Sequence, residues 1–177
     1  MKRYIPILAA VAALAGCANM PGSGGNAASA SASATLQPTR GNTTAGSVRF
    51  TQHGDRVLVM GEVRGLKPNS EHGFHVHEKG DCSSGDGNSA GGHFNPQSRP
   101  HGRHGTGAHH VGDLPSLRSD AAGVARFNFE SRSIAVGNGA ADIVGRGLIV
   151  HANPDDYTTQ PTGNAGARLA CAVITRN

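Results

Sequence analysis

The chain has 177 residues, with 26 glycines, no tryptophan and only 4% aromatic residues, and its formal net charge is +4. This length suits one domain preceded by a short N-terminal segment. Two of the positive charges, Lys2 and Arg3, lie in a segment that we expect to be removed, so the remaining excess is small and does not indicate a nucleic-acid partner.

The first 16 residues have the features of a secretory signal peptide. Lys2 and Arg3 precede an apolar run from Ile5 to Leu14, which is too short to span a bilayer. The run ends in Leu-Ala-Gly-Cys, which resembles a bacterial lipoprotein processing site where the cysteine, here Cys17, is acylated and becomes the new N-terminus. A cleaved signal without lipid and an uncleaved hydrophobic tail are the alternatives.

Residues 17–33 are expected to form an acylated cysteine and a flexible linker. Ala18 to Ser33 are almost all Ala, Gly, Ser and Asn, a composition that cannot bury enough apolar surface to order itself. We therefore predict a lipid-anchored protein on the periplasmic side of the cell envelope, with the lipid as its only membrane contact. Ala18 after the anchoring cysteine favours the outer membrane.

The remaining residues, 34–177, are expected to form one all-β domain. Gly54-Asp55 separates two alternating runs and predicts a hairpin turn, and no segment has a sustained helical period. The pattern predicts an antiparallel β-sandwich or flattened barrel with long loops. The predicted strands are 47–51, 56–63, 71–77, 124–130, 148–150 and 170–174.

Seven side chains that can bind metal occur along the chain, and they fall into two groups that share His93. His75 and His77 end a predicted strand, where residues two apart point to the same face and lie about 6–7 Å apart. A polar, glycine-rich stretch leads from there to His93, and the others follow in loops long enough to indicate a function. Three imidazoles with one carboxylate suit zinc, and an all-imidazole set suits copper. The remaining members are His101, His110, Asp113 and His151.

We do not expect the other histidines to bind metal. His53, His104 and His109 are predicted to be exposed loop residues. His72 is predicted to make a structural hydrogen bond, because its side chain should point to the strand face opposite His75.

Four motifs resemble those of the copper/zinc superoxide dismutases. The resemblance implies a Greek-key arrangement of about eight strands. It also implies copper ligands at His75, His77, His93 and His151, and zinc ligands at His93, His101, His110 and Asp113, so that His93 is shared. The motifs are Gly73 to Glu78 (GFHVHE), Ala90 to Pro96 (AGGHFNP), His110 to Leu114 (HVGDL) and Gly163 to Cys171 (GNAGARLAC).

The resemblance gives roles to four more residues. Arg168 matches the arginine beside copper, which steers and holds the anionic substrate. Asp155 matches the carboxylate that links a copper-bound histidine to a zinc-bound one. Cys82 and Cys171 match the family's intrachain disulfide, which leaves Cys17 as the third cysteine.

The implied activity is dismutation of superoxide by copper redox cycling, with zinc structural and His93 both bridging the metals and carrying a proton. A periplasmic protein that buffers or delivers copper and zinc is the alternative, although such a relative should lack a ligand, the arginine or the carboxylate. A copper-only enzyme is disfavoured because the zinc set is complete. Whether the protein forms a homodimer is left open by the sequence. Lys79, Arg99 and Arg103 are candidates for additional steering.

Overall fold

The computed structural model describes residues 29–177 together with Met1 and Lys2. Apart from Met1 and Lys2, the predicted signal peptide lies outside the described residues, as do Cys17 and most of the predicted linker. Within them, no helix has the length and apolar character that a membrane crossing requires.

The described chain is built from antiparallel strands, with one short 3-10 turn, η1, at Asn88–Ala90. All six predicted strand regions are confirmed, and the region 71–77 is divided at Gly73. The strands are β1 (Ser31–Pro38), β2 (Ala45–His53), β3 (Arg56–Arg64), β4 (Glu71–His72), β5 (Phe74–His77), β6 (Leu117–Arg118), β7 (Ala125–Ser131), β8 (Gly147–His151), β9 (Arg168–Val173) and β10 (Thr175–Arg176).

Eight strands form one curled sheet in the order β5-β8-β9-β1-β2-β3-β7, with β10 paired to β1, and β4 pairs with β6. The predicted hairpin joins β2 to β3, where Gly54 has the positive φ of 58° that a tight turn needs. Neighbouring strands are far apart in sequence at β3–β7, β5–β8 and β1–β9, as Greek-key connections require. The all-β prediction is confirmed.

The first strand begins earlier than the predicted domain boundary at residue 34. Ser31 pairs with Thr51, and Ala32, Ala34 and Leu36 point alternately into the core. The Ala/Ser composition of residues 31–33 resembles a linker, but these small side chains pack against β2 and so become part of the sheet.

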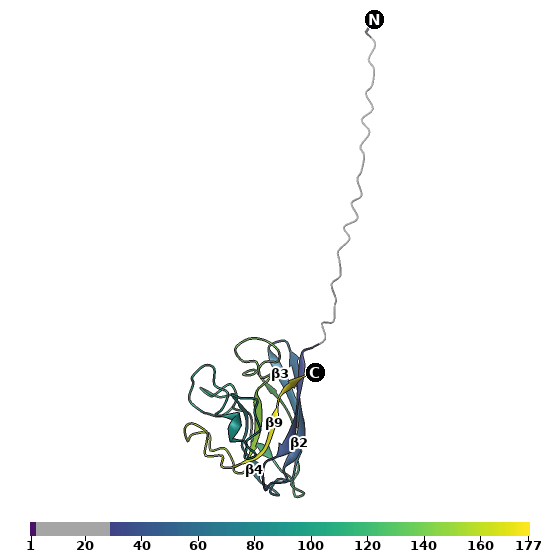
Figure 1. Ribbon diagram of the computed structural model, residues 1–177. Helices are drawn as coiled ribbons and strands as arrows, with labels where there is room; N and C mark the ends of the chain where they lie inside the picture. The colour runs from purple at the N-terminus through teal and green to yellow at the C-terminus, as the bar shows by residue number, and fades with distance from the viewer. Residues whose placement is uncertain (3–28) are drawn as a thin grey trace.

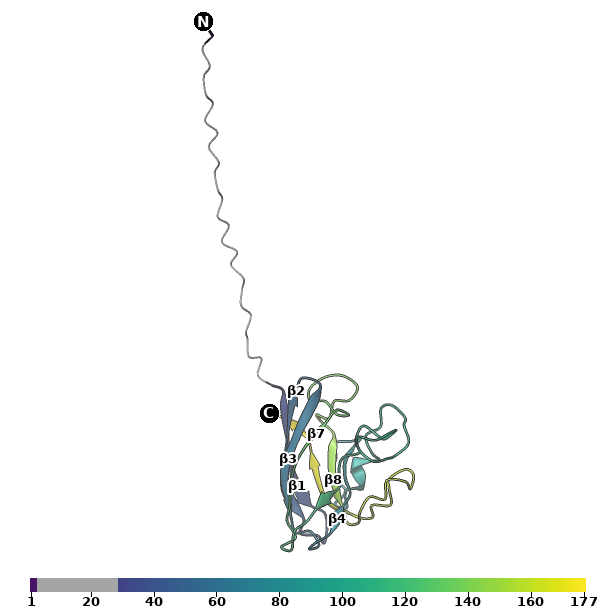
Figure 2. The ribbon, with the colours of Figure 1, turned by 180° about the vertical axis from the view of Figure 1, so that it is seen from behind.

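Two layers enclose the core. Strands β1, β2, β3 and β7 form one layer, and β5, β8 and β9 lie across from it (Figures 1 and 2). The Phe74 and Phe127 rings, 5.4 Å apart between centroids, join the layers inside. The long teal and yellow loops gather outside β8 and β9, away from β2 and β3, in both views. The functional loops therefore rest on one wall of the barrel.

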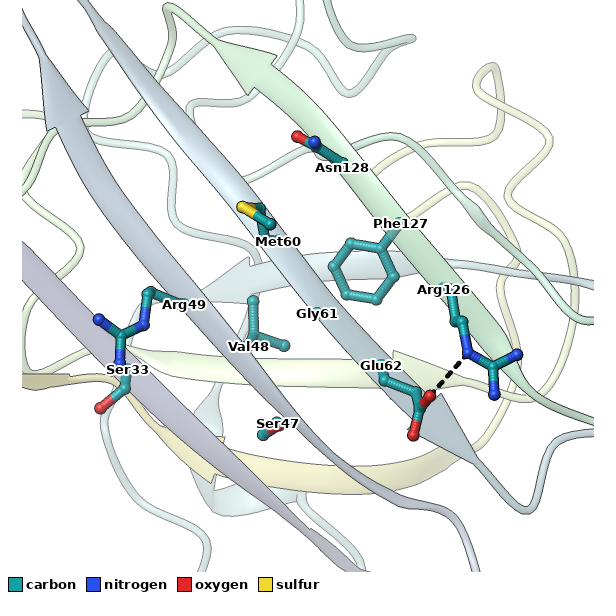
Figure 3. A pocket seen from close by; sticks show the side chains of 10 residues that line it. All are labelled: Ser33, Ser47, Val48, Arg49, Met60, Gly61, Glu62, Arg126, Phe127 and Asn128. Atoms are coloured by element: carbon teal, nitrogen blue, oxygen red, sulfur yellow. Dashed lines mark ion pairs between the residues drawn. The ribbon is translucent and has the colours of Figure 1, made fainter.

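The opposite wall carries a shallow hollow of about 680 Å³ on its outer face. Gly61 has no side chain and leaves a gap in this hollow. A Cβ there would collide with the Ser47 carbonyl oxygen and the Phe127 ring. Figure 3 shows Arg49, Met60 and Arg126 around this gap, with Arg126 paired to Glu62 at 2.8 Å. None of the seven predicted metal ligands lines this hollow.

Candidate metal centre

Strand β5 presents two histidines to the loops. Phe74 and Val76 point into the hydrophobic core, so His75 and His77 point to the other face, and all four residues are buried. On the neighbouring strand, β8, His151 stands at a register shift in the pairing with β9. The shift re-aims the end of β8, and the His77 and His151 rings stack 5.6 Å apart between centroids.

The free edge of β5 holds the loop that follows it. Single antiparallel bridges pair His77 with His93 and His75 with Asp113. Between them, the Phe94 amide donates to the Val76 carbonyl at 2.8 Å and the Val76 amide donates to the Gly112 carbonyl at 2.9 Å. Backbone pairing thus places side chains from a long loop against the two histidines of the strand.

The first group contains four buried imidazoles with nitrogen atoms that have no hydrogen-bond partner among the described residues. Such atoms are rare in folded proteins because leaving a buried polar group unpaired costs about 1–3 kcal/mol. Their convergence is what a metal ion would require, and one ligand atom from each residue lies within 4.8 Å of all the others. The atoms are His75 Nδ1, His77 Nε2, His93 Nε2 and His151 Nε2.

The second group converges on one oxygen of Asp113. The Nδ1 atoms of His93, His101 and His110 lie 2.9, 3.0 and 3.4 Å from Asp113 Oδ1. Ligands at about 2.0–2.1 Å from a tetrahedral zinc ion are about 3.3 Å from one another, so the spacing fits zinc. Burial would raise the pKa of Asp113, but hydrogen bonds from the three imidazoles outweigh it and hold the pKa well below its usual range.

His93 belongs to both groups. Its Nδ1 faces Asp113 and its Nε2 faces the four-histidine group, so the two ring nitrogens address the two sites. The geometry brings together all seven predicted ligands.

Hydrogen bonds from the opposite ring nitrogens fix the imidazole orientations. His77 Nδ1 lies 2.9 Å from the Gly91 carbonyl and His151 Nδ1 lies 3.2 Å from that of Gly166. Each carbonyl accepts a hydrogen bond from the Nδ1–H of its histidine. The Nε2 atom that faces the group is then unprotonated, as metal binding requires. Burial holds the pKa of both histidines well below the usual value, which favours the same neutral form.

Asp155 links a histidine of the first group to a histidine of the second. Its carboxylate accepts hydrogen bonds from His75 Nε2 at 2.7 Å and from His101 Nε2 at 2.8 Å. The Tyr157 amide donates a third bond at 2.7 Å. Burial would raise the pKa of Asp155, but these bonds outweigh it and lower the pKa, so the carboxylate stays ionised.

Arg168 lies at the mouth of the four-histidine group. It lines a hollow of about 380 Å³ together with His77 and His151. Its two terminal nitrogens each donate at 2.7 Å, to the carbonyls of Gly87 and Gly91, which fixes the guanidinium plane. Burial lowers the pKa of Arg168, but guanidinium remains charged at all ordinary pH values.

Cys82 and Cys171 are joined by a disulfide, with a Cα–Cα separation of 5.9 Å. The bond connects the loop that follows β5 to strand β9 and packs against Ala90 and Ile149. The predicted pairing is confirmed for the described residues.

The remaining predicted histidines divide. His72 makes the expected structural hydrogen bond, from Nδ1 to the His151 carbonyl at 2.9 Å, and His53 is exposed. The prediction that His104 and His109 are exposed is wrong, because both are half-buried. The His104 ring donates to the Asp113 carbonyl at 2.9 Å and the His109 ring contacts the His110 carbonyl at 2.6 Å.

Two residues that the sequence analysis did not single out hold His101 and Asp155 in place. Gln160 accepts from the His101 amide at 2.8 Å and donates to the His101 carbonyl at 3.0 Å. Gly163 packs directly against Asp155 and His101. The motif Gly163 to Cys171 marked this glycine as part of a pattern, but nothing local indicated its neighbours.

The curled β-sheet and its two buried groups sharing one imidazole define a protein built to hold two metal ions side by side. Residues 44–174 match the family model described as copper/zinc superoxide dismutase (SODC). The chain belongs to the copper/zinc superoxide dismutase family.

Individual relatives agree with this assignment. The superoxide dismutase [Cu-Zn] of Paramecium bursaria Chlorella virus 1 is 42% identical over 135 residues, covering 73% of this chain and 71% of the relative. The superoxide dismutase [Cu-Zn] 2 of Aquifex aeolicus (strain VF5) is 36% identical over 133 residues, covering 73% and 78%. The crystal structure of the clock protein EA4 superimposes with a TM-score of 0.76 at 40% identity, covering 84% of this chain and 95% of that one.

Proposed function

We propose that this chain dismutates superoxide, so that two superoxide anions and two protons give one dioxygen and one hydrogen peroxide. The observation that carries the proposal is the orientation of His93, with one ring nitrogen toward each group. The family assignment agrees with it.

His75, His77, His93 and His151 would hold copper, and His93, His101, His110 and Asp113 would hold zinc. Copper supplies a centre that alternates between two oxidation states, and zinc is structural. The donor sets fit these roles, because the first is all imidazole and the second includes a carboxylate.

His93 Nε2 is the atom we assign to proton transfer. It is buried and has no hydrogen-bond partner among the described residues, whereas Nδ1 is engaged with Asp113. Without metal, burial lowers the pKa of His93 to about 4, so the buried ring is neutral at ordinary pH. With both metals bound, the ring would serve as a ligand to each of them and as a proton carrier.

Arg168 attracts and orients the anion. It has no carboxylate within ion-pair distance in the part of the chain that the structure describes, so its charge is directed at the hollow. Arg168→Ala should keep the metal content and fold while lowering kcat/KM, and Arg168→Glu should lower it further. Equal kcat/KM in all three proteins at low salt would remove Arg168 from the mechanism.

The function is tested by metal analysis combined with a superoxide-decay assay on the purified domain, residues 29–177. We expect one copper and one zinc per chain and rapid decay. Full metal loading without acceleration of superoxide decay would instead support a copper- and zinc-buffering or delivery protein. The complete ligand set, with Arg168 and Asp155 in place, favours the enzyme.

We also propose that the mature protein is held by a lipid on Cys17 at the periplasmic side of the outer membrane. The support is the sequence from Lys2 to Ala18. Wild-type protein should fractionate with membranes and carry acyl mass, whereas Cys17→Ser should be released or remain unprocessed. A soluble wild-type protein without acyl mass would refute the anchor.

A further inference from the structure

Three charged side chains line the hollow that leads to His77 and His151, among the residues that the structure describes. They are Arg168, Arg40 and Asp86. Lys79, Arg99 and Arg103, the candidates from the sequence, do not line it. Arg40 belongs to the turn between β1 and β2, far from every metal-binding motif in the sequence.

The turn that carries Arg40 is fastened to the strand that carries Arg168. The Thr39 amide donates to the Leu169 carbonyl at 3.0 Å, and the Thr39 hydroxyl donates to the Arg168 carbonyl at 2.6 Å. The side-chain amide of Asn42 in turn donates to the Thr39 hydroxyl at 2.8 Å. The backbone around Arg40 therefore has a fixed position relative to Arg168.

The opposite side of the same turn is fastened to the glycine-rich loop. The Arg40 amide donates to the Gly85 carbonyl at 2.6 Å, and a Cβ on Gly85 would lie 2.9 Å from a terminal nitrogen of Arg40. This loop also supplies Gly87, the carbonyl partner of Arg168. The Arg168 guanidinium and the Arg40 backbone are thus held by the same loop at the rim of the hollow.

The Arg40 charge has no counterion within 4.0 Å in the described chain, although Arg56, Arg64 and Arg126 each pair with a carboxylate. Asp86 supplies the one negative charge at the rim, and its carboxylate is occupied by hydrogen bonds from Asn88. The rim therefore carries two positive charges and one negative charge.

We propose that Arg40 is a steering residue that draws the anionic substrate into the hollow toward Arg168, and that Asp86 opposes it. The inference rests on the proposed function, since superoxide is the anion. An exposed charge at the mouth of a cleft raises the local concentration of oppositely charged ligands and their association rate. At separations of about 8 Å in water, one unit charge contributes about 0.5 kcal/mol, or slightly more than a twofold effect.

The test compares Arg40→Gln with a matched control, Arg49→Gln. Arg49 is an exposed arginine on the opposite wall (Figure 3), and its substitution removes the same charge. At low salt, Arg40→Gln should lower kcat/KM about twofold, and Asp86→Asn should raise it. Arg49→Gln should change it little. The decline of kcat/KM with ionic strength should be shallower in Arg40→Gln than in wild type.

A second measurement does not depend on turnover. Azide, a small monoanion, is titrated into the copper-loaded proteins and its Kd is followed by absorption. Arg40→Gln should raise this Kd by a similar factor, and Asp86→Asn should lower it. If Arg40→Gln and Arg49→Gln agree in both the Kd and the salt dependence, the steering role of Arg40 is overturned. Wild type that binds azide in an Arg40-dependent way without accelerating superoxide decay would overturn the proposed function alone.

Discussion

Gly163 lies beside Asp155 at a position where an added Cβ would collide with the carboxylate. A Cβ on Gly163 would overlap Asp155 Oδ1 and press on His101 Nε2, the two atoms that form a hydrogen bond across it. Gly163 also has a φ of 66°, which side-chain-bearing residues rarely adopt. The absence of a side chain here lets Asp155 reach both His75 and His101.

Gly163→Ala should therefore displace Asp155 and loosen His101. Loss of such a supporting contact typically weakens metal binding about 10- to 100-fold, and we expect this range for zinc, measured by chelator competition. Gly139→Ala is the control, because Gly139 has a φ of 76° but no atom within 4 Å of the added carbon. A zinc affinity of Gly163→Ala equal to that of Gly139→Ala and of wild type would contradict the role assigned to Gly163.

Removal of a shared ligand should differ from removal of an unshared one. His93→Ala should weaken both sites, whereas His110→Ala should chiefly reduce zinc and the order of its loop, because His110 belongs to the second group alone. Elemental analysis after metal loading measures the difference. Metal-replete wild type with copper but no zinc would contradict the two-metal assignment.

The disulfide should contribute to stability because it closes a long loop between residues separated by 89 positions. Reduction of the Cys82–Cys171 bond should lower the free energy of unfolding by about 2–5 kcal/mol, measured by urea denaturation with and without reductant. Non-reducing peptide mapping should recover the two cysteines as one cross-linked pair. A free thiol at either position in oxidised protein would contradict the structure.

The metal-free protein should be most stable near pH 6.5. Burial holds the pKa of His77 and His151 well below the usual value for histidine and lowers the pKa of His93 to about 4. The unfolded chain takes up these protons first as the pH falls, so the stability from these residues is present above about pH 6.5 and is lost toward pH 4.

His101 acts in the opposite direction. Burial would lower its pKa, but hydrogen bonds to Asp113 and Asp155 outweigh burial and raise the pKa to about 9. Its contribution is present below about pH 6.5 and is lost as the pH rises toward 9. Urea titrations of metal-free protein between pH 4 and 9 should show the maximum, and a flat profile would contradict the shifts.

The sequence patterns correctly predicted features that depend on neighbouring residues in the chain, such as strands and the face on which a side chain lies. Alternation identified β2, β3 and β7, and the spacing of His75 and His77 placed them on one face of β5. Strand β1 was missed because its Ala and Ser residues become strand only when β2 covers them. Two-residue strands such as β6 and β10 carry no periodicity to detect.

The contacts around the metal groups depend on the tertiary fold. Gln160 reaches His101 across 59 residues, and Asp155 reaches His75 across 80. No pattern within either segment encodes such pairings, so Asp155 was assigned through the family resemblance and Gln160 was not identified. The half-burial of His104 similarly follows from its contact with the Asp113 carbonyl, which forms only after the loop has folded back.

The position of β1 between β2 and the C-terminal strands has a consequence for the order of folding. β2 is the next strand to leave the ribosome and can pair with β1 at once, but β9 and β10 include residues 168–176, which are made long after β1. Pairing strands so far apart in sequence costs loop entropy, and the contacts of β9 and β10 offset it only once residues 168–176 have been made. Until then, one edge of β1 lacks its partner, and a chain truncated before residue 168 should keep that edge exposed to aggregation.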